Sequence, residues 1–175
     1  MKTTLADIEG FAPIASGKPR VLILGSMPGE ASLQKQEYYG HIRNAFWPIM
    51  AELFGADSHL SYAQKKAILI ENGIAVWDVL QSCRRNGSLD SNIAMASIKI
   101  NDFSGFFERF RSIRRVFFNG GMASTVYRRY ILGILQGKYD YLEYYKLPST
   151  SPAYATLNFT DKLEAWRLIK QPVVK

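Results

Sequence analysis

Four short apolar runs, each followed by small or turn-forming residues, constrain this 175-residue chain more than any other feature. Runs of this length, rich in Val, Ile, Leu and Phe, are typical of buried strands, and helical segments separate them. The alternation predicts an α/β fold: a single three-layer α/β/α domain over residues 1–175 with a central, mostly parallel four-stranded sheet. The runs cover residues 20–24, 74–80, 115–118 and 141–147.

Capping and stop residues predict where the helices between these strands begin and end. Gly55 is expected to end a helix over residues 46–54, and Ser61 to cap a helix over residues 62–71. Asn101 is expected to cap a helix that runs through residue 111, with its phenylalanines on the core side. Two more helices are predicted, one reaching about residue 132 and one over about residues 161–169.

The loops after the strands predict where a ligand binds. Three of the four strands end in residues rich in Gly, Ser, Asn or Pro. In open α/β sheets, ligands bind at the carboxyl ends of the strands. We therefore expect a site that combines residues 25–29, 77–82, 119–121 and 148–154.

The charge distribution favours an anionic partner. The formal net charge is +7, and residues 101–175 carry +6 of it. Their arginines, clustered at 109–115 and 128–129, could face phosphates, or they could solvate the outer faces of amphipathic helices. Charge alone does not choose between these two roles.

Histidine and cysteine are scarce: the chain has His41, His59 and Cys83. Neither an intrachain disulfide nor a Cys/His zinc site nor a four-cysteine cluster can be built from them. We therefore expect no metal and no cofactor. The first residues lack the apolar stretch of an export signal, and no apolar run approaches the ~20 residues of a membrane span. A cytoplasmic location and no membrane partner are expected.

Two motifs carry the candidate chemistry. The first begins Gly25-Ser-Met-Pro-Gly29 and continues to His41-Ile-Arg-Asn-Ala-Phe-Trp47. Its small residues let backbone N–H groups approach a ligand, although the lysine and the glycine spacing of known phosphate loops are missing. The second, Leu147-Pro-Ser-Thr-Ser-Pro-Ala-Tyr-Ala155, is a proline-stiffened loop with three hydroxyls, suited to phosphate contacts, in which Tyr154 could wedge against a base step. Either motif alone is also compatible with an ordinary turn.

Together, at this separation, the two motifs resemble those of the uracil-DNA glycosylase superfamily, specifically its hypoxanthine-DNA glycosylase branch. The resemblance runs from about residue 20 to residue 169. It implies a uracil-DNA glycosylase-like fold and a monomeric, monofunctional enzyme of base-excision repair. The implied partner is double-stranded DNA that contains a deaminated base, with hypoxanthine expected before uracil.

The resemblance also implies roles for single residues. Met27 stands where several branches of the superfamily carry a catalytic Asp or Asn. The hypoxanthine branch resembles this chain in lacking that residue and uses instead an Asn that corresponds to Asn44, whose neutral amide would position a water. Phe46 resembles the base-stacking aromatic, and Asp78 the position that reads the base edge. The implied base pocket is Gly25, Ser26, Met27, Pro28, Phe46, Asp78 and Asn119. The implied DNA-binding residues are Ser149, Thr150, Ser151, Pro152, Ala153 and Tyr154, and His41 and Arg43 support the catalytic segment.

Departures from the family pattern keep alternatives open. Ile42 replaces the branch's proline, and Ser149 replaces a His or Asn that polarises the base carbonyl in other branches, which weakens the case for uracil. The chain could thus be a non-catalytic nucleic-acid-binding module, or an enzyme that acts on free nucleotides through residues 25–29. The pocket motifs contain no lysine that could act as a Schiff-base nucleophile, so a strand-cutting lyase step is not expected.

Overall fold

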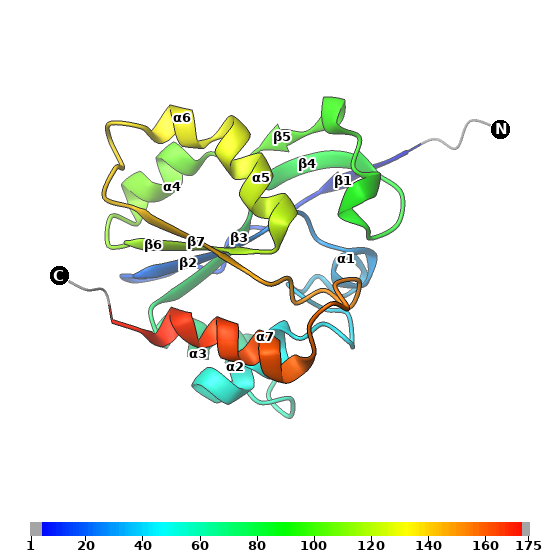
Figure 1. The fold of residues 1–175 in the computed structure, drawn as a ribbon, viewed down its shortest axis with the longest axis vertical. Helices are drawn as coiled ribbons and strands as arrows, with labels where there is room; N and C mark the ends of the chain where they lie inside the picture. Colours follow the sequence, from blue (N-terminus) through cyan, green and yellow to red (C-terminus); the bar gives the residue numbers. More distant parts are fainter. Residues whose placement is uncertain (1–4, 173–175) are drawn as a thin grey trace.

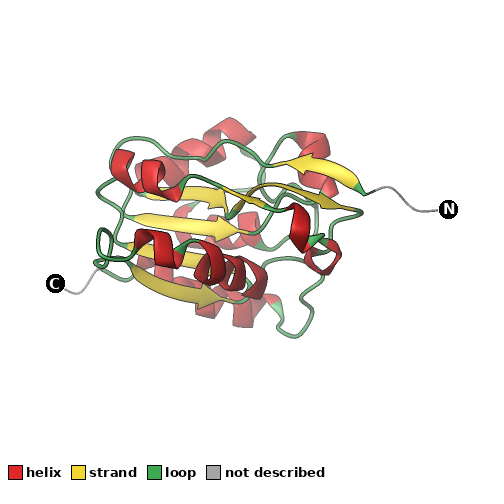
Figure 2. Cartoon of the chain, turned by 90° about the horizontal axis from the view of Figure 1, so that it is seen from above, coloured by secondary structure: helices red, strands yellow, loops and turns green. Residues whose placement is uncertain are grey.

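The computed structural model describes residues 5–172 and is built around a parallel sheet of four strands. The two ends of the predicted domain, residues 1–4 and 173–175, lie outside the described part. The sheet runs through the middle of the molecule with helices on both faces (Figures 1 and 2), which confirms the predicted three-layer α/β fold. Its order is β3-β2-β6-β7, and each neighbouring pair is parallel. The strands are β2 (Val21–Gly25), β3 (Ile74–Asp78), β6 (Arg115–Asn119) and β7 (Glu143–Leu147).

Both faces of the sheet are covered, which explains the continuous apolar runs in the sequence. Strands β2 and β3 are buried at every position. Helices α4, α5 and α6 cover one face and α2, α3 and α7 the other (Figure 1). Across residues 5–172, none of the helices combines the length and the apolar character that crossing a membrane would need. The helix bounds are α1 (Glu30–Lys35), α2 (Phe46–Phe54), α3 (Tyr62–Glu71), α4 (Phe103–Arg109), α5 (Gly121–Tyr130), α6 (Leu132–Leu135) and α7 (Phe159–Trp166).

The strand order creates a crevice at one edge of the sheet. After β2 the chain forms β3 on one side of that strand and, later, β6 on the other side. The direction of connection therefore reverses between β2 and β6, and this is the position where open α/β sheets bind ligands. Residues 25–29 follow β2 and residues 119–121 follow β6, so the two loops meet at this edge.

Local capping explains which helix boundaries were predictable. The bounds of α2 and α3 agree with the prediction, and Ser61 forms a capping box in which its Oγ accepts the Gln64 N–H at 3.2 Å. The predicted cap of α4 was wrong. Asp102 caps this helix, because its Oδ1 accepts the Gly105 N–H at 2.9 Å, while the Asn101 side chain donates to the Asp78 carbonyl.

A second, antiparallel sheet was not predicted. Its order is β1-β4-β5, formed by Ala6–Glu9, Leu80–Arg85 and Lys99–Ile100. The run at residues 74–80, predicted as one strand, therefore contains the whole of β3 and Leu80, the first residue of β4. Strand β4 mixes buried and exposed positions and is rich in polar residues, so it carries no continuous apolar signal. The segment after it, with a 3₁₀ turn at Asp90–Asn92, reaches the crevice of the parallel sheet.

Candidate active site

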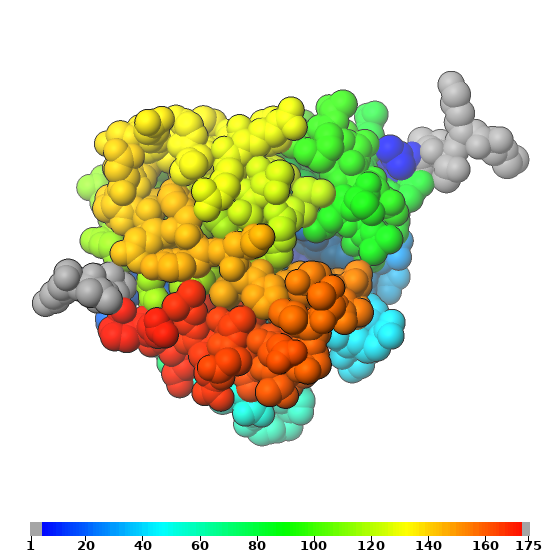
Figure 3. Space-filling model, viewed as in Figure 1, coloured from blue at the N-terminus to red at the C-terminus, as the bar shows by residue number. Residues whose placement is uncertain are grey.

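A cavity of about 330 Å³ lies at the carboxyl edge of the parallel sheet. The segments that line it come from both motifs and from the second sheet: residues 25–32, 38–44, 88–90, 119–121 and 149–154, together with Asp78. Figure 3 shows the surface hollowed between the green segment after β4 and the orange loop after β7. This volume is at the lower end of the range of about 300–1,000 Å³ that is typical of ligand pockets, and it suits a small ring system.

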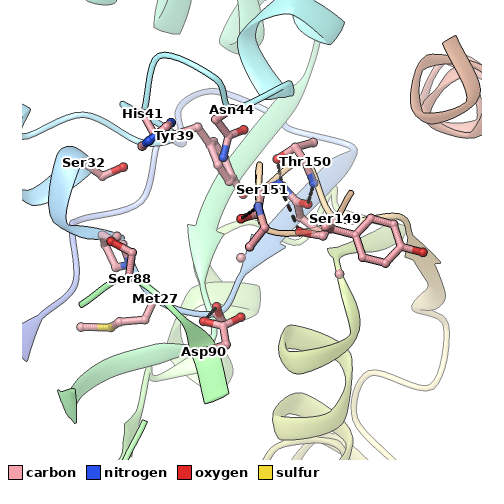
Figure 4. Close-up of a pocket in the computed structure, with 18 of the residues that line it drawn as sticks. Met27, Ser32, Tyr39, His41, Asn44, Ser88, Asp90, Ser149, Thr150 and Ser151 are labelled. Atoms are coloured by element: carbon pink, nitrogen blue, oxygen red, sulfur yellow. Dashed lines mark hydrogen bonds between the residues drawn. The ribbon is translucent and has the colours of Figure 1, made fainter. Parts of the chain in front are cut away.

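Most of the predicted site residues come together around this cavity. In Figure 4, His41, Tyr39 and Asn44 lie on one side, Met27, Ser88 and Asp90 on another, and residues 149–151 between them. The predicted residues that line the cavity are Gly25, Ser26, Met27, Pro28, His41, Asn44, Asp78, Asn119 and all six residues from Ser149 to Tyr154. Phe46 and Arg43 are not among the lining residues.

The structure corrects the position of Phe46. Its ring is fully buried in the core and stacks on Tyr39 with the ring centroids 4.0 Å apart. Tyr39 stands between Phe46 and the cavity, and its backbone has a positive φ of 56°, which is uncommon outside glycine. Such a conformation is often kept at functional sites. The ring that separates Phe46 from the cavity is therefore Tyr39, which lines the wall together with Tyr38 and Tyr154. The sequence analysis missed Tyr39, because no local pattern marks this residue as part of the wall.

Asn44 is held in a fixed orientation. Its Oδ1 accepts the Phe46 N–H at 2.9 Å, and its own N–H donates to the His41 carbonyl at 2.9 Å. The next residue, Ala45, donates its N–H to the Thr150 carbonyl at 2.9 Å, so the two motifs are joined directly. An amide oxygen accepts two hydrogen bonds, which leaves Oδ1 of Asn44 able to hold a water as well.

His41 and Arg43 differ in their relation to the cavity. His41 lines it, and its Nδ1 accepts the Arg43 N–H at 3.1 Å, so a neutral ring carries its proton on Nε2. Arg43 is exposed outside the cavity wall. His41 therefore shapes the turn that precedes Asn44, whereas the Arg43 side chain does not reach into the pocket.

The floor of the cavity holds two polar groups without partners. Asp78 is buried at the end of β3, and its Oδ2 has no hydrogen bond; the hydroxyl of Tyr39 also has none. Gly25 makes room for both, because a Cβ at Gly25 would clash with Asp78 Oδ1 and lie 3.2 Å from Tyr39 Oη. Unpaired buried polar groups are costly, so their presence in a cavity wall indicates a polar ligand.

Burial changes the ionisation of Asp78. The pKa of this carboxyl is raised to about 7: loss of hydration is the main cause, the nearby Asp90 adds to the rise, and the Arg85 guanidinium opposes it. The pKa of Asp90 is also raised by burial, against a hydrogen bond from Ser26. A carboxyl group whose pKa is about 7 is partly protonated at neutral pH, and the neutral acid offers one hydrogen-bond donor and one acceptor.

Arg85 holds the segment of residues 86–90, which contributes a wall of the cavity, against the first motif. Its side chain is fully buried, and it donates to the carbonyls of Pro28 and Gly87. Its Nη1 lies 3.9 Å from Asp90 Oδ1, and Ser26 Oγ donates to that same oxygen at 2.7 Å. Residues 86–90 are thus attached to the first motif. The sequence analysis missed this wall because the partners are about 60 positions apart and leave no local pattern.

The second motif is held by side chains from β6 and α7. Asn119 Nδ2 donates to Thr150 Oγ1 at 2.8 Å, and its Oδ1 accepts the Thr150 N–H at 2.9 Å. Asn119 therefore borders the cavity, as predicted, but both ends of its amide are engaged with the loop. Lys162 is buried beneath the loop and donates to the Tyr154 carbonyl at 2.8 Å, and desolvation lowers its pKa. The loop itself carries no charge, and its backbone is held beside the cavity by Asn119 and by the Lys162 ammonium.

The fold and the site define an α/β enzyme with a polar ligand pocket at the carboxyl edge of a parallel sheet. The family model described as the uracil DNA glycosylase superfamily matches residues 13–170 of the chain. The chain belongs to this superfamily, which makes it a DNA glycosylase, a hydrolase of N-glycosyl bonds.

Relatives and a solved structure agree with this assignment. A protein of Methanosarcina acetivorans named hypoxanthine DNA glycosylase is 38% identical over 116 residues, which are 66% of this chain and 72% of the relative. A Methanosarcina barkeri protein of the same name is 35% identical over 113 residues, 64% of this chain and 70% of the relative. A solution NMR structure of a candidate uracil DNA glycosylase from Methanosarcina acetivorans is 32% identical. It matches 95% of this chain and all of its own with a TM-score of 0.74.

Proposed function

We propose that the protein releases deaminated bases, hypoxanthine above all, from double-stranded DNA by hydrolysing the N-glycosidic bond, and that it acts as a cytoplasmic monomer. The observation that carries this proposal is the cavity, which brings Asn44, the buried carboxyl of Asp78 and the loop of residues 149–154 to one opening. The names of the two Methanosarcina relatives support hypoxanthine rather than uracil as the principal base.

The chemistry of the floor suits a deaminated base. Hypoxanthine and uracil both present a ring N–H beside a carbonyl, so a matching group needs one acceptor and one donor. The neutral carboxyl of Asp78 has both, whereas its ionised form only accepts. The unpaired Tyr39 hydroxyl lies close to the same place and can bind a further polar atom of the ring.

Bond cleavage needs a water and a stabilised leaving group. Positive charge develops on the sugar and negative charge on the departing base as the bond breaks. The Asn44 amide does not titrate, so its role is to hold a water against the anomeric carbon rather than to remove a proton. Ser26 and Met27 of the first motif line the cavity, and their backbone N–H groups would be the donors that stabilise the negative base.

Access to the cavity requires the nucleotide to leave the duplex. Turning it out costs a few kcal/mol, and least for a base that pairs poorly, which favours deaminated bases. The half-buried hydroxyls of Ser149 and Ser151 suit contacts to the neighbouring phosphates, and Lys162 adds positive charge beneath them. The net positive charge of residues 101–175 also favours binding of the DNA phosphates.

The test is base release from duplexes that contain one deoxyinosine, one deoxyuridine or a G·T mismatch, measured as strand breaks after alkali. We expect most product from deoxyinosine and no strand break without alkali, because the proposed enzyme leaves an intact abasic strand. Absence of product from all three duplexes would refute the proposal. Free inosine nucleotides belong in the same assay, since their hydrolysis without duplex cleavage would assign the pocket to nucleotide metabolism.

A further inference from the structure

Two carboxyl groups face the cavity, and the proposed reaction uses one of them. Asp78 lies at the floor, and Asp90 belongs to the wall, where 39% of its side chain is exposed (Figure 4). Negative charge develops on a departing hypoxanthine, so an ionised Asp90 opposes the release of this base. A partly buried carboxylate costs free energy unless a positive charge compensates it, so Asp90 indicates a ligand that brings such a charge.

The protein's own positive charge near Asp90 lies behind the wall. Arg85 Nη1 is 3.9 Å from Asp90 Oδ1 and has no hydrogen bond within the described residues. Arg85 uses its other nitrogens on the carbonyls of Pro28 and Gly87 and is not among the residues that line the cavity. None of the described lining residues is a lysine or an arginine. A ligand in the cavity therefore meets the two carboxyls with no cation between them.

The floor offers an acceptor that no group of the protein uses. Asp78 is 3% exposed, and its Oδ2 has no hydrogen bond within the described residues. An ionised carboxylate accepts on both oxygens, so it pairs best with two neighbouring N–H groups on one edge of a ring. Guanine has such an edge, formed by its N1–H and its amino group, whereas hypoxanthine has the N1–H without the amino group.

Aromatic rings in the wall suit a positively charged ring as well. Tyr39 stacks on Phe46 with the centroids 4.0 Å apart and separates it from the cavity, and Tyr38 and Tyr154 also line the wall. The face of an aromatic ring carries partial negative charge and attracts a cation within about 6 Å of its centre. The carboxyls and the rings together favour a flat, cationic ligand.

We propose that the cavity also takes purines that carry a fixed positive charge, of which 7-methylguanine is the representative, and releases them from DNA. This second activity goes beyond the proposed function and rests on it in one respect, that the cavity receives a base turned out of a duplex. The two adjacent N–H groups of the cationic base meet Asp78, and its charge lies in the field of Asp90 and the tyrosine rings. Unmodified guanine offers the same edge without the charge, and it would have to leave as an anion.

The cleavage of this substrate differs from that of deoxyinosine. The C1′–N9 bond breaks and its electron pair passes to N9, which cancels the positive charge of the methylated ring. The base departs as a neutral molecule and needs neither a proton nor donors that stabilise an anion. The water held by Asn44 adds its oxygen to C1′ and gives one proton to the solvent. The ionised form of Asp78 is thus the useful one here, whereas hypoxanthine needs the neutral form.

The two substrates should therefore respond differently to pH. Since the pKa of Asp78 is about 7, release of 7-methylguanine should rise by about tenfold per pH unit between about pH 5 and pH 7, while release of hypoxanthine stays level. Other titratable or charged groups near Asp78 or across the cavity are Asp90, Arg85, His41 and the tyrosines at 38, 39 and 62. The tyrosines stay neutral because burial raises their pKa. Asp78→Asn should make the 7-methylguanine profile flat.

Release is measured on two duplexes of one sequence, one with a single 7-methylguanine and one with a single deoxyinosine. Single-turnover rates are taken from chromatography of the free base, and the spontaneous loss of 7-methylguanine without enzyme is subtracted. We expect the wild type to release both bases, with the two pH profiles described above. A rise with pH that persists in Asp78→Asn would assign the titration to another group, such as His41, and overturn the role of the floor.

A second measurement needs no cleavage. Fluorine at C2′ blocks bond breaking, so dissociation constants can be compared for duplexes with fluorinated 7-methylguanosine or fluorinated guanosine. We expect the wild type to prefer the methylated duplex and Asp90→Asn to lose about tenfold of this preference, as for one charge-assisted contact. The asparagine keeps an acceptor for the Ser26 hydroxyl. Glu108→Gln is the matched control: this carboxylate is 56% exposed on α4, outside the cavity wall, and its loss should leave the preference unchanged.

The wild type alone can overturn the inference, so the test does not depend on any variant folding. No release of 7-methylguanine above the spontaneous loss, or equal affinity for the two fluorinated duplexes, would do so. Release of hypoxanthine without 7-methylguanine leaves the proposed function standing and removes this second activity. Release of 7-methylguanine without hypoxanthine refutes the proposed function and supports the cationic substrate. An unchanged preference in a folded Asp90→Asn would show that Asp90 does not read the charge.

Discussion

Asn119 and Thr150 exchange two hydrogen bonds, one from the Asn119 amide nitrogen to Thr150 Oγ1 at 2.8 Å and one from the Thr150 N–H to Asn119 Oδ1 at 2.9 Å. This pair fastens the loop after β7 to the end of β6. Since Thr150 also accepts the Ala45 N–H through its carbonyl, the Asn119 amide indirectly sets the position of the segment that carries Asn44.

Replacing Asn119 by Ala should therefore weaken DNA binding as well as the fold. Both bonds are lost and buried groups of Thr150 remain unpaired, so we expect a loss of about 1–3 kcal/mol in the free energy of unfolding. Affinity for a deoxyinosine duplex should fall with it, measured by fluorescence anisotropy. Asn119→Asp keeps the acceptor for the Thr150 N–H and should give a smaller loss of stability. If Asn119→Ala binds DNA as the wild type does, the amide does not position the loop.

Replacing Asn44 by Ala should remove base release while largely preserving DNA affinity. Without the amide no group holds the water, and loss of positioning of this kind costs about 100-fold in rate. The measurements are the single-turnover rate of base release from a deoxyinosine duplex and the dissociation constant of the variant for the same duplex. Because Asn44→Ala also loses the bond to the Phe46 N–H, Asn44→Asp serves as the control that keeps an acceptor there. An unchanged rate in Asn44→Ala would refute the catalytic role.

The pH profile should report on Asp78. The pKa of its buried carboxyl is raised to about 7, and the neutral form is the one that can donate to a base carbonyl. The rate at low substrate concentration should therefore fall by about tenfold per pH unit above pH 7. Asp78→Asn keeps a donor and an acceptor without a proton to lose, so its profile should stay flat over this range. A fall of equal slope in Asp78→Asn would assign the titration to another group.

The same carboxyl should make stability depend on pH. Its pKa is near 4 in the unfolded chain and about 7 in the folded protein, so the folded state binds the proton more tightly. The contribution of the neutral acid is complete below about pH 4 and is lost as the pH rises to about 7. We expect Asp78→Asn to raise the melting temperature at pH 8 and to change it little at pH 4. A rise of equal size at both values would contradict the assigned pKa.

Replacing Gly25 by Ala should close the floor of the cavity. The added methyl group would meet the Asp78 carboxyl and approach the Tyr39 hydroxyl, and overpacking of this kind costs about 1–3 kcal/mol in stability. The loss of stability lowers the folded fraction, but the rate of base release per folded molecule should fall as well. The measurement is therefore the single-turnover rate divided by the fraction of folded protein. Gly133→Ala in α6 is the control, because a Cβ there meets nothing within 4 Å and should leave activity unchanged.

The elements that could be predicted are those that local interactions define. Helix α3 begins at Ser61 because the capping box needs only the first helical turn. Strand β2 and the centre of β6, residues 116–118, are apolar because both faces of a parallel sheet are covered. The two motifs were placed at one site because each directly follows a strand of that sheet.

The details of the site depend on contacts between distant parts of the chain. Asp90 meets Ser26 across 64 positions through an antiparallel sheet with no apolar run to reveal it. The family resemblance indicated Phe46 as the base-stacking ring, but packing against the core buries it and leaves Tyr39 in the wall.

The +7 charge, the scarcity of histidine and cysteine, the four parallel strands and the two loops that follow β2 and β7 were thus determined by the sequence alone. Only the tertiary structure decided that Phe46 is buried behind Tyr39, that the Asn119 amide holds the loop, and that Asp78 is buried without a hydrogen bond to its Oδ2. The physical reason is that strand and helix formation follows from periodicity and capping among neighbouring residues. The burial of a group, its hydrogen-bond partners and its pKa follow from which distant residues the packing brings against it.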